Sequence, residues 1–244
     1  MNNQSIDNSE DLTKKERKIL RTRNIILDAA KKAFSEKGFD FVTMEEIADL
    51  SALSRATLYN YFSTKEEIYF TIGISKLEGW FEQYESLDST KYSGAQMILF
   101  LTENLVRDLL ESPIYIKLLR RFFYRSKELN IPIQEKFYDV MIENKEIHKN
   151  FKLESQNDIF LELLKAYIKY RQLWKRSIEI GVKDGTINTP SNPTHLNFIL
   201  IMIIFGLLDQ IDFRRSLMDM VNLSNDEIIG FIVRLTTKFL EGEI

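Results

Sequence analysis

A short stretch of side chains around position 55 has the types and spacing needed to read the edges of DNA bases. Arg55 offers a guanidinium, Thr57 a hydroxyl and Asn60 an amide, while Ala56 adds a methyl group that can meet the methyl of thymine. These groups match the donors, acceptors and methyl groups that base pairs present in the major groove. The stretch therefore predicts an interface with double-stranded DNA.

These groups must stand on the outer face of a helix. Ser54 is a good N-cap for a helix over residues 55–62, and it is counted among the residues expected at the DNA. Leu58 and Phe62 are four residues apart and would anchor this helix on its inner face. We expect base contacts from Arg55, Thr57 and Asn60, and phosphate contacts from Thr43, Tyr59 and Tyr61.

A second short helix precedes this one. Thr43 can cap its start, and Glu46 three residues later completes the capping-box pattern, so the helix begins at Met44. Residues 50–53 interrupt the polar and apolar rhythm and separate the two helices. The pattern is that of a helix-turn-helix.

Positive charge is concentrated just before this motif. Residues 12–38 contain nine lysines and arginines against three acidic residues, although the whole chain has a formal net charge of −3. A long helix is expected over residues 15–37, with Lys18, Arg21 and Arg23 near its start. A local basic patch on an otherwise acidic protein suits a phosphate backbone.

The sequence lacks the residue patterns that several kinds of catalysis and metal binding need. The chain has no cysteine, and His148 and His195 lie far apart without metal-ligand spacing. No catalytic triad pattern, paired-carboxylate site or glycine-rich phosphate loop is recognisable, so we expect no enzyme, no cofactor and no metal. The first 24 residues are polar rather than a signal peptide, and the apolar run 198–208 is short for a bilayer. We therefore expect a cytoplasmic protein without membrane contact.

Many short motifs follow one another in a set order over residues 23–67, namely Arg23, residues 26–30, Phe34, residues 37–39, Thr43, Ile47 and Ala48, Ser54, residues 57–59, Tyr61 and Phe62, and Lys65 and Glu66. In this order they resemble the DNA-binding domain of the TetR family of bacterial transcriptional regulators. The resemblance implies an N-terminal DNA-binding head and a C-terminal domain that binds a ligand and dimerises.

The resemblance also bears on particular positions. In the family, the lysine that matches Lys65 binds a phosphate from the start of a helix, and we expect Lys65 and Arg23 to approach the DNA backbone. Where the family usually has glycine, this chain has Ala52 in the turn and Ala56 at the start of the recognition helix. An alanine at positive φ costs on the order of 1 kcal/mol, so the turn should be strained or reshaped.

The remaining sequence predicts an all-α protein. A third motif helix follows Ser63 and Thr64 and continues to about Tyr84, and further helices are expected at residues 94–110, 113–127, 132–150, 158–184, 193–217 and 226–240. We expect a disordered arm at residues 1–14, a three-helix head with the helix-turn-helix at 15–67, and a larger helical ligand-binding and dimerisation domain at 68–244. The long helix that leaves the head would link ligand binding to DNA binding.

The helix that contains residues 198–208 is apolar on every side. A helix on the surface of a monomer would not tolerate this composition. We expect it to pack on its own core and on a second copy, with the last helix beside it; the alternative is the central helix of a monomeric bundle. The predicted interface residues are Phe198, Met202, Ile203, Phe205, Ile229 and Ile232.

Aromatic residues recur at helical spacing in the body. Such stripes usually form core, yet long aromatic helices with a few internal polar groups can also enclose a cavity for a small apolar or amphipathic ligand. The candidate ligand contacts are the aromatic Trp80, Tyr84, Tyr167, Tyr170 and Trp174 and the polar Gln96, Asn104 and Arg107.

These features predict a transcriptional regulator, a homodimeric repressor that releases a near-palindromic operator when the ligand binds. The alternative is a helical interaction or scaffold protein with a degenerate DNA-binding head. Ala52 and the acidic Glu45, Glu46 and Asp49 near the motif are the arguments for it. An enzyme is the less favoured third interpretation.

Overall fold

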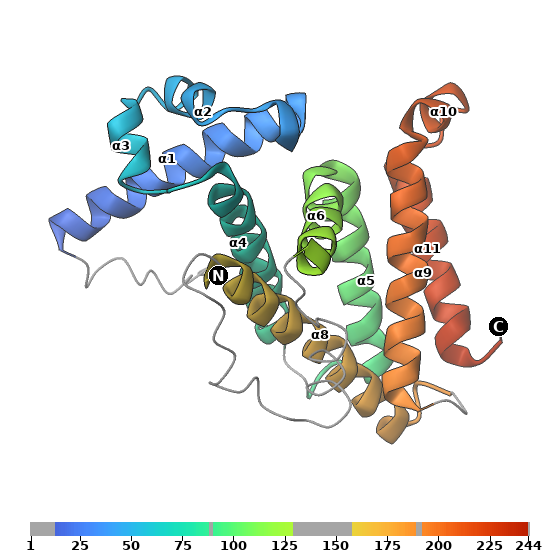
Figure 1. Ribbon diagram of the computed structural model, residues 1–244. Helices are drawn as coiled ribbons and strands as arrows, with labels where there is room; N and C mark the ends of the chain where they lie inside the picture. Colours follow the sequence, from blue (N-terminus) through green and yellow to red (C-terminus); the bar gives the residue numbers. More distant parts are fainter. Residues whose placement is uncertain (1–12, 88–89, 129–157, 189–191, 244) are drawn as a thin grey trace, which may run out of the picture. The chain divides into compact units, whose positions relative to one another are not determined.

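The computed structural model describes residues 13–87, 90–128, 158–188 and 192–243 (Figure 1). Every regular element in these residues is a helix, which confirms the predicted all-α class. The chain divides into two compact units, Met1–Ile72 and Gly73–Ile244, called here the N-terminal and the C-terminal unit. The predicted helix at residues 132–150 and most of the predicted N-terminal arm lie outside the described residues.

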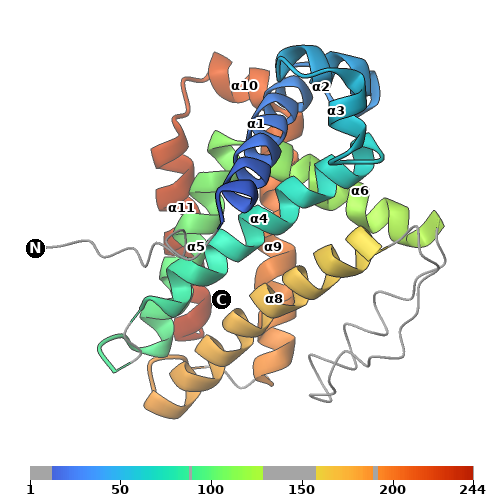
Figure 2. The same cartoon turned by 90° about the vertical axis from the view of Figure 1, so that its left-hand side faces the viewer.

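The N-terminal unit is a small helical head. It contains α1 (Lys14–Lys37), the 3-10 helix η1 (Phe39–Phe41), α2 (Met44–Leu50), α3 (Arg55–Tyr59) and the start of α4 (Lys65–Glu85). α2 packs against both α1 and α3 (Figure 2).

Side-chain caps fix the helix starts of this unit where the sequence predicted them. The Thr43 hydroxyl accepts a hydrogen bond from the amide of Glu46 at 3.2 Å, and the Ser54 hydroxyl accepts one from the amide of Thr57 at 3.1 Å. The carboxylate of Glu46 pairs with Lys37 rather than with the backbone of Thr43, so only half of the predicted capping box forms. Each cap satisfies an amide that would otherwise lack a partner at the helix start.

Aromatic side chains form the centre of the N-terminal unit. Phe34 of α1, Phe39 of η1 and Tyr69 of α4 make a cluster with ring centroids 4.8–5.6 Å apart. The first turns of α4, including the fully buried Ile68, are therefore part of this core. This packing explains why the unit extends to Ile72, beyond the residue 67 that the sequence suggested as its end.

In the C-terminal unit, α5 (Gly94–Glu111) is the central helix (Figure 1). It packs against α6 (Ile114–Glu128), α8 (Asp158–Asp184), α9 (Pro193–Phe213) and α11 (Asn225–Glu241). Its buried stripe is almost entirely leucine, isoleucine, methionine and valine at helical spacing. The predicted bounds of α5, α6, α8 and α11 agree with the structure to within one residue at their starts.

One helix was predicted over residues 193–217, whereas the structure has two. α9 ends at Phe213, Arg214 departs from helical geometry at φ −110° and ψ 25°, and α10 (Arg215–Met220) follows. The Arg215 guanidinium donates hydrogen bonds to the carbonyl of Leu110 at 2.6 Å and to the side chain of Asn225 at 3.0 Å. These tertiary contacts hold α10 at the end of α5 and the start of α11. The sequence around residue 214 does not predict them, because their partners lie elsewhere in the chain.

The apolar helix α9 is buried on one side only. α9 is long and apolar enough to cross a membrane, but core helices of globular proteins often have the same length and composition. Leu200, Ile204 and Leu208 lie in the core of the C-terminal unit, whereas Met202 and Ile203 are exposed. Among the described residues, nothing covers the opposite, apolar face of α9.

Candidate nucleic-acid interface

The helix α3 has the two faces that its sequence predicts. Leu58 and Phe62 are buried, with exposed fractions of 0% and 1%. Arg55, Tyr59 and Asn60 are exposed on the other side. The helix proper ends at Tyr59, but the amide of Phe62 still donates to the carbonyl of Leu58 at 3.0 Å, so the chain keeps its turn to that point.

The remaining residues of this face also lie where the pattern placed them. Ser54 and Ala56 are exposed, and Thr57 and Tyr61 are half-buried. The hydroxyls of Ser54 and Thr57 are 2.8 Å apart, which fixes both side chains at the start of the helix. The structure therefore brings the predicted base-reading groups together on one exposed surface.

The turn between α2 and α3 keeps its shape at the expense of backbone strain. Ala52 has φ +54°, the left-handed region that favours glycine. The amide of Leu53 donates to the carbonyl of Ala48 at 2.9 Å, and the amide of Ala52 donates to that of Asp49 at 3.1 Å. Of the two possibilities stated from sequence, the strained turn is the one observed.

Two acidic residues beside α3 are neutralised by basic partners. Glu45 forms an ion pair with Arg55 at 3.3 Å, and Glu46 pairs with Lys37. Exposed pairs of this kind contribute little stability. Their relevance is electrostatic, because each pair offsets the negative charge of a glutamate that would otherwise repel DNA phosphates. These glutamates were among the arguments for a scaffold protein with a degenerate DNA-binding head.

The two basic residues expected at phosphates make intramolecular contacts. The Arg23 guanidinium carbon lies 4.4 Å from the ring centroid of Phe62, and Arg23 is half-buried. The Lys65 ammonium donates to the carbonyls of Phe39, Asp40 and Val42 at 2.9, 3.2 and 2.9 Å. These three carbonyls hold the ammonium of Lys65 in this structure, and its contact with a phosphate stays a prediction.

The predicted aromatic ligand contacts lie in the core of the C-terminal unit. Trp80 and Tyr170 have ring centroids 5.2 Å apart, and Tyr170 and Trp174 are 6.3 Å apart. The hydroxyl of Tyr84 is hydrogen-bonded to that of Ser177. Burial raises the pKa of the Tyr84, Tyr167 and Tyr170 hydroxyls, so these phenols stay neutral.

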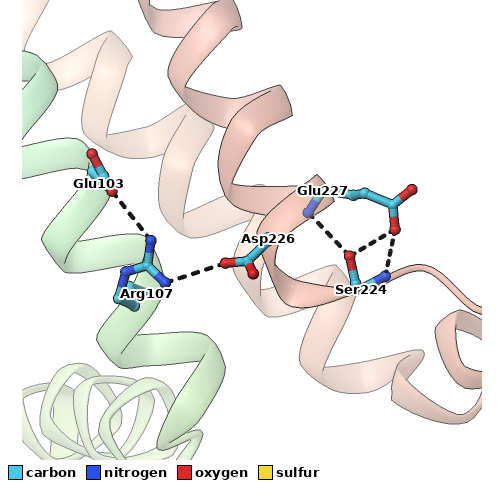
Figure 3. A network of polar contacts seen from close by, with 5 residues as sticks. All are labelled: Glu103, Arg107, Ser224, Asp226 and Glu227. Carbon is cyan, nitrogen blue, oxygen red and sulfur yellow. Dashed lines mark hydrogen bonds and ion pairs between the residues drawn. The ribbon is translucent and has the colours of Figure 1, made fainter.

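Of the three polar ligand candidates, Gln96 is exposed and Asn104 and Arg107 are half-buried, so none of them is fully internal; their contact with a ligand stays a prediction. Gln96 accepts a hydrogen bond from the amide of Ser93 and caps α5 at the surface. Asn104 donates to a carbonyl of its own helix. Arg107 pairs with Glu103 and with Asp226 of α11, each at 3.2 Å (Figure 3). All three stand on faces of α5 that its apolar stripe leaves outside the core.

Other polar residues are internal and were not singled out from the sequence. Arg171 is 2% exposed and donates to the backbone carbonyl of Asn197 at a long 3.5 Å. Within the described residues, neither amide atom of the buried Asn197 side chain has a hydrogen-bond partner. Helical periodicity could have shown that Arg171 is internal, because this residue lies between Tyr167 and Trp174 on the stripe assigned to the core.

At least two hollows occur among the described residues of the C-terminal unit. A pocket of about 170 Å³ lies beside Tyr84, Met97 and Arg176, and a groove of about 700 Å³ lies between α9, α10 and α11. The groove is lined mainly by apolar side chains, among them Ile211 and Phe231. No group of three or more histidine, aspartate or glutamate side chains that could hold a metal occurs in the described ranges.

The predicted dimer residues divide into two groups. Met202 and Ile203 are exposed, at 64% and 37%, and Phe198 and Phe205 are half-buried. Ile229 and Ile232 are instead buried in their own unit, at 4% and 2%, because this stripe of α11 faces α5. The exposed apolar residue of α11 is Phe231.

Known proteins resemble this chain in both units. The family profile described as bacterial regulatory proteins, tetR family, matches residues 26–72. YhgD of Bacillus subtilis, an uncharacterized HTH-type transcriptional regulator, is 25% identical over 186 residues, which cover 76% of this chain and 82% of that protein.

Solved structures share the fold. A TetR transcription regulator from Haloarcula marismortui has a TM-score of 0.62 at 17% identity and covers 91% of this chain and 98% of that chain. FadR of Bacillus subtilis, in complex with stearoyl-CoA, has a TM-score of 0.59 at 14% identity and covers 88% and 98%. The family match therefore identifies the helix-turn-helix of residues 26–72 as a DNA-binding unit of the tetR family of bacterial regulatory proteins, and the chain is a DNA-binding transcriptional regulator.

Proposed function

We propose that the protein is a cytoplasmic repressor that binds a near-palindromic operator as a homodimer and releases it when a small, largely apolar or amphipathic ligand binds the C-terminal unit. The observation that carries this proposal is the exposed polar face of α3, held from behind by the buried Leu58 and Phe62. The function is regulation rather than catalysis.

The residues of the head have separate roles in this proposal. Base edges are read by groups that are exposed or half-buried on α3, and phosphates are met by hydroxyls at its margin and at the start of α2. The basic α1 supplies long-range attraction to the duplex. The base-reading residues are Arg55, Thr57 and Asn60, and the phosphate contacts are Thr43, Tyr59 and Tyr61.

A salt-titrated gel shift with fragments of the source genome tests this function. A regulator binds a few fragments selectively in the presence of competitor DNA, and its affinity falls as salt rises. Equal binding to all fragments, or no binding, would favour the helical scaffold instead. The selected fragments also supply the operator needed for the measurements below.

Arg55→Ala should separate base reading from backbone anchoring. Loss of a bidentate contact to a base costs about 1–3 kcal/mol on the operator and relaxes selectivity at one position. Arg21→Ala removes the same charge from an exposed site on α1 and serves as the control, with equal losses on operator and random DNA. If Arg55→Ala lowered the affinity for operator and for random DNA equally, Arg55 would contact the phosphate backbone of the DNA, as Arg21 does, and not a base.

The proposed dimer forms through the exposed side of α9. Ile199, Met202, Ile203 and Phe213 recur on it at helical spacing and are all exposed apolar residues. A twofold axis through this surface would pair α9 and α11 with their copies and present two α3 helices to successive major grooves, about 34–36 Å apart or farther.

The proposed ligand acts through α4, because this helix contributes to both units. Its first turns belong to the core of the head, and its second half places Trp80 against Tyr170 in the C-terminal unit. The structural likeness to FadR, which was solved with stearoyl-CoA, supports a ligand with a long apolar part. A ligand that separates Trp80 from Tyr170 would shift α4 and change the placement of α3.

Ligand and operator should oppose each other by the same factor. A coupling of about 1–3 kcal/mol changes operator affinity roughly 5–150-fold, and by linkage the operator must weaken the ligand equally. A compound that raises the melting temperature of the free protein is titrated with and without operator. Trp80→Leu should weaken the compound, whereas Tyr124→Leu, at an exposed site on α6, should not. Identical ligand affinity in both states would exclude an inducer site.

A further inference from the structure

A carboxylate of α2 lies beside the guanidinium that is proposed to read a base. Oε1 of Glu45 is 3.3 Å from Nη1 of Arg55, and the two side chains are 42% and 69% exposed. We propose that Glu45 is a positioning residue that holds Arg55 ready for a guanine and keeps it from the neighbouring phosphates. This inference rests on the proposed function, because it takes base reading by Arg55 as given.

The ion pair leaves an edge of the guanidinium for the DNA. In this planar group, Nε and Nη2 together form the side edge, and Nη1 lies away from that edge. Glu45 engages the Nη1 end. A bidentate contact to the O6 and N7 atoms of a guanine can use Nε and Nη2. Arg55 can therefore bind the base and Glu45 at the same time.

The carboxylate stands on a helix whose place next to α3 is fixed. Ile47 and Ala48 of α2 are fully buried, and α2 packs against both α1 and α3. Across the turn, the amide of Leu53 donates to the carbonyl of Ala48 at 2.9 Å. The backbone therefore sets how far apart the two side chains begin, and the ion pair has only the rotamers of Glu45 and Arg55 to select.

An arginine on an exposed helix face can bind phosphates as well as bases. Phosphate contacts carry no sequence information, so each arginine that turns to the backbone is lost for base reading. The negative charge of Glu45 repels a phosphate that approaches Arg55, whereas a guanine carries no net charge. Glu45 also lowers the rotamer freedom that Arg55 must give up on binding. Both effects favour the operator over random DNA, and the repulsion weakens binding to random DNA.

Glu45→Gln tests this role, because it removes the charge and keeps the length of the side chain. The ratio of operator affinity to random-DNA affinity should fall by about 2–5-fold, within the range that exposed ion pairs contribute. The affinity for random DNA should rise, and selectivity should relax at the same base pair at which Arg55→Ala relaxes it. If Glu45 only stabilised the fold, both affinities would fall in the same proportion.

Asp49→Asn is the matched control for charge. Asp49 is exposed on the same helix, so this variant removes one negative charge and leaves the partner of Arg55 in place. The affinity ratio should stay as in the wild type. In the Arg55→Ala background, Glu45→Gln should have no further effect on selectivity, because the two residues act as one unit. A remaining effect would mean that Glu45 contacts the DNA itself, which would overturn the proposal.

NMR relaxation of the Nε–H group of Arg55 gives a readout that needs no DNA. In the free protein this group should be ordered in the wild type and in Asp49→Asn, and more mobile in Glu45→Gln. Equal mobility in all three proteins, or an unchanged affinity ratio in Glu45→Gln, would refute the positioning role. If the wild type binds no DNA fragment selectively, the proposed function fails, and the relaxation data still decide whether Glu45 holds Arg55.

Discussion

Met202→Arg should yield a folded monomer with at least about 100-fold lower operator affinity, because a dimer gains that much or more from engaging both half-sites at once. Met202 is 64% exposed in the single chain, so an arginine there meets only water in the monomer. In a dimer formed through α9, the same guanidinium would be buried without a partner, which is strongly unfavourable. The substitution therefore acts on assembly and not on folding.

Sedimentation at micromolar concentration measures the assembly, and circular dichroism confirms the fold. Val182→Arg, at a 42% exposed apolar site on α8, is the control and should remain dimeric with full operator affinity. Ile229→Arg is unsuitable, because Ile229 is buried in its own unit and a charge there would unfold it. A monomeric wild type, or a dimeric Met202→Arg, would contradict an interface on α9.

The head could be predicted because its determinants are local. Thr43 and Ser54 cap helices through amides three residues away, and Leu58 and Phe62 share one helix face by their spacing. Even the strain at Ala52 follows from the need for a left-handed residue in the turn. Each of these statements needs only a few consecutive residues.

The contacts of the Lys65 side chain could not be predicted from a few consecutive residues. Its acceptors are backbone carbonyls 23–26 residues earlier in the chain, and a backbone carbonyl carries no residue type that a motif could display. The resemblance to a family supplied a role for the residue, but the orientation of the ammonium depends on how η1 meets α4. The same kind of long-range contact, from Arg215 to Leu110, separates α10 from α9.

The C-terminal unit shows which question periodicity leaves open. Helical spacing groups residues into faces, but it does not say which face meets which neighbour. Ile229 was therefore assigned to the dimer interface although it faces α5, and Arg107 was taken as internal although it pairs with Asp226 at the surface. Arg171 shows the opposite error. It lies on a buried stripe, but it was not predicted to be internal because arginine is usually exposed.

Gly94→Ala should lower the free energy of unfolding of the C-terminal unit by roughly 3 kcal/mol or more, at the upper end of overpacking effects. A Cβ on Gly94 would lie 2.0 Å from the amide nitrogen of Gly181 and 2.4 Å from the carbonyl oxygen of Ser177. Both are backbone atoms of α8, so no side-chain rotation relieves the clash and α5 must move away. That movement would also break the hydrogen bond from the amide of Gly94 to Asp184 at 2.9 Å.

Gly79→Ala is the matched control, since it makes the same chemical change at another helical glycine. Apart from its two chain neighbours and the backbone of its own helix, no atom in the described part of the chain lies within 4 Å of the position that a Cβ on Gly79 would occupy. Alanine should therefore stabilise α4 by about 1 kcal/mol through helix propensity alone. Urea denaturation of both variants measures the two effects, which should have opposite signs. If Gly94→Ala were as stable as the wild type, α5 and α8 could not approach as closely at Gly94 and Gly181 as the structure has them.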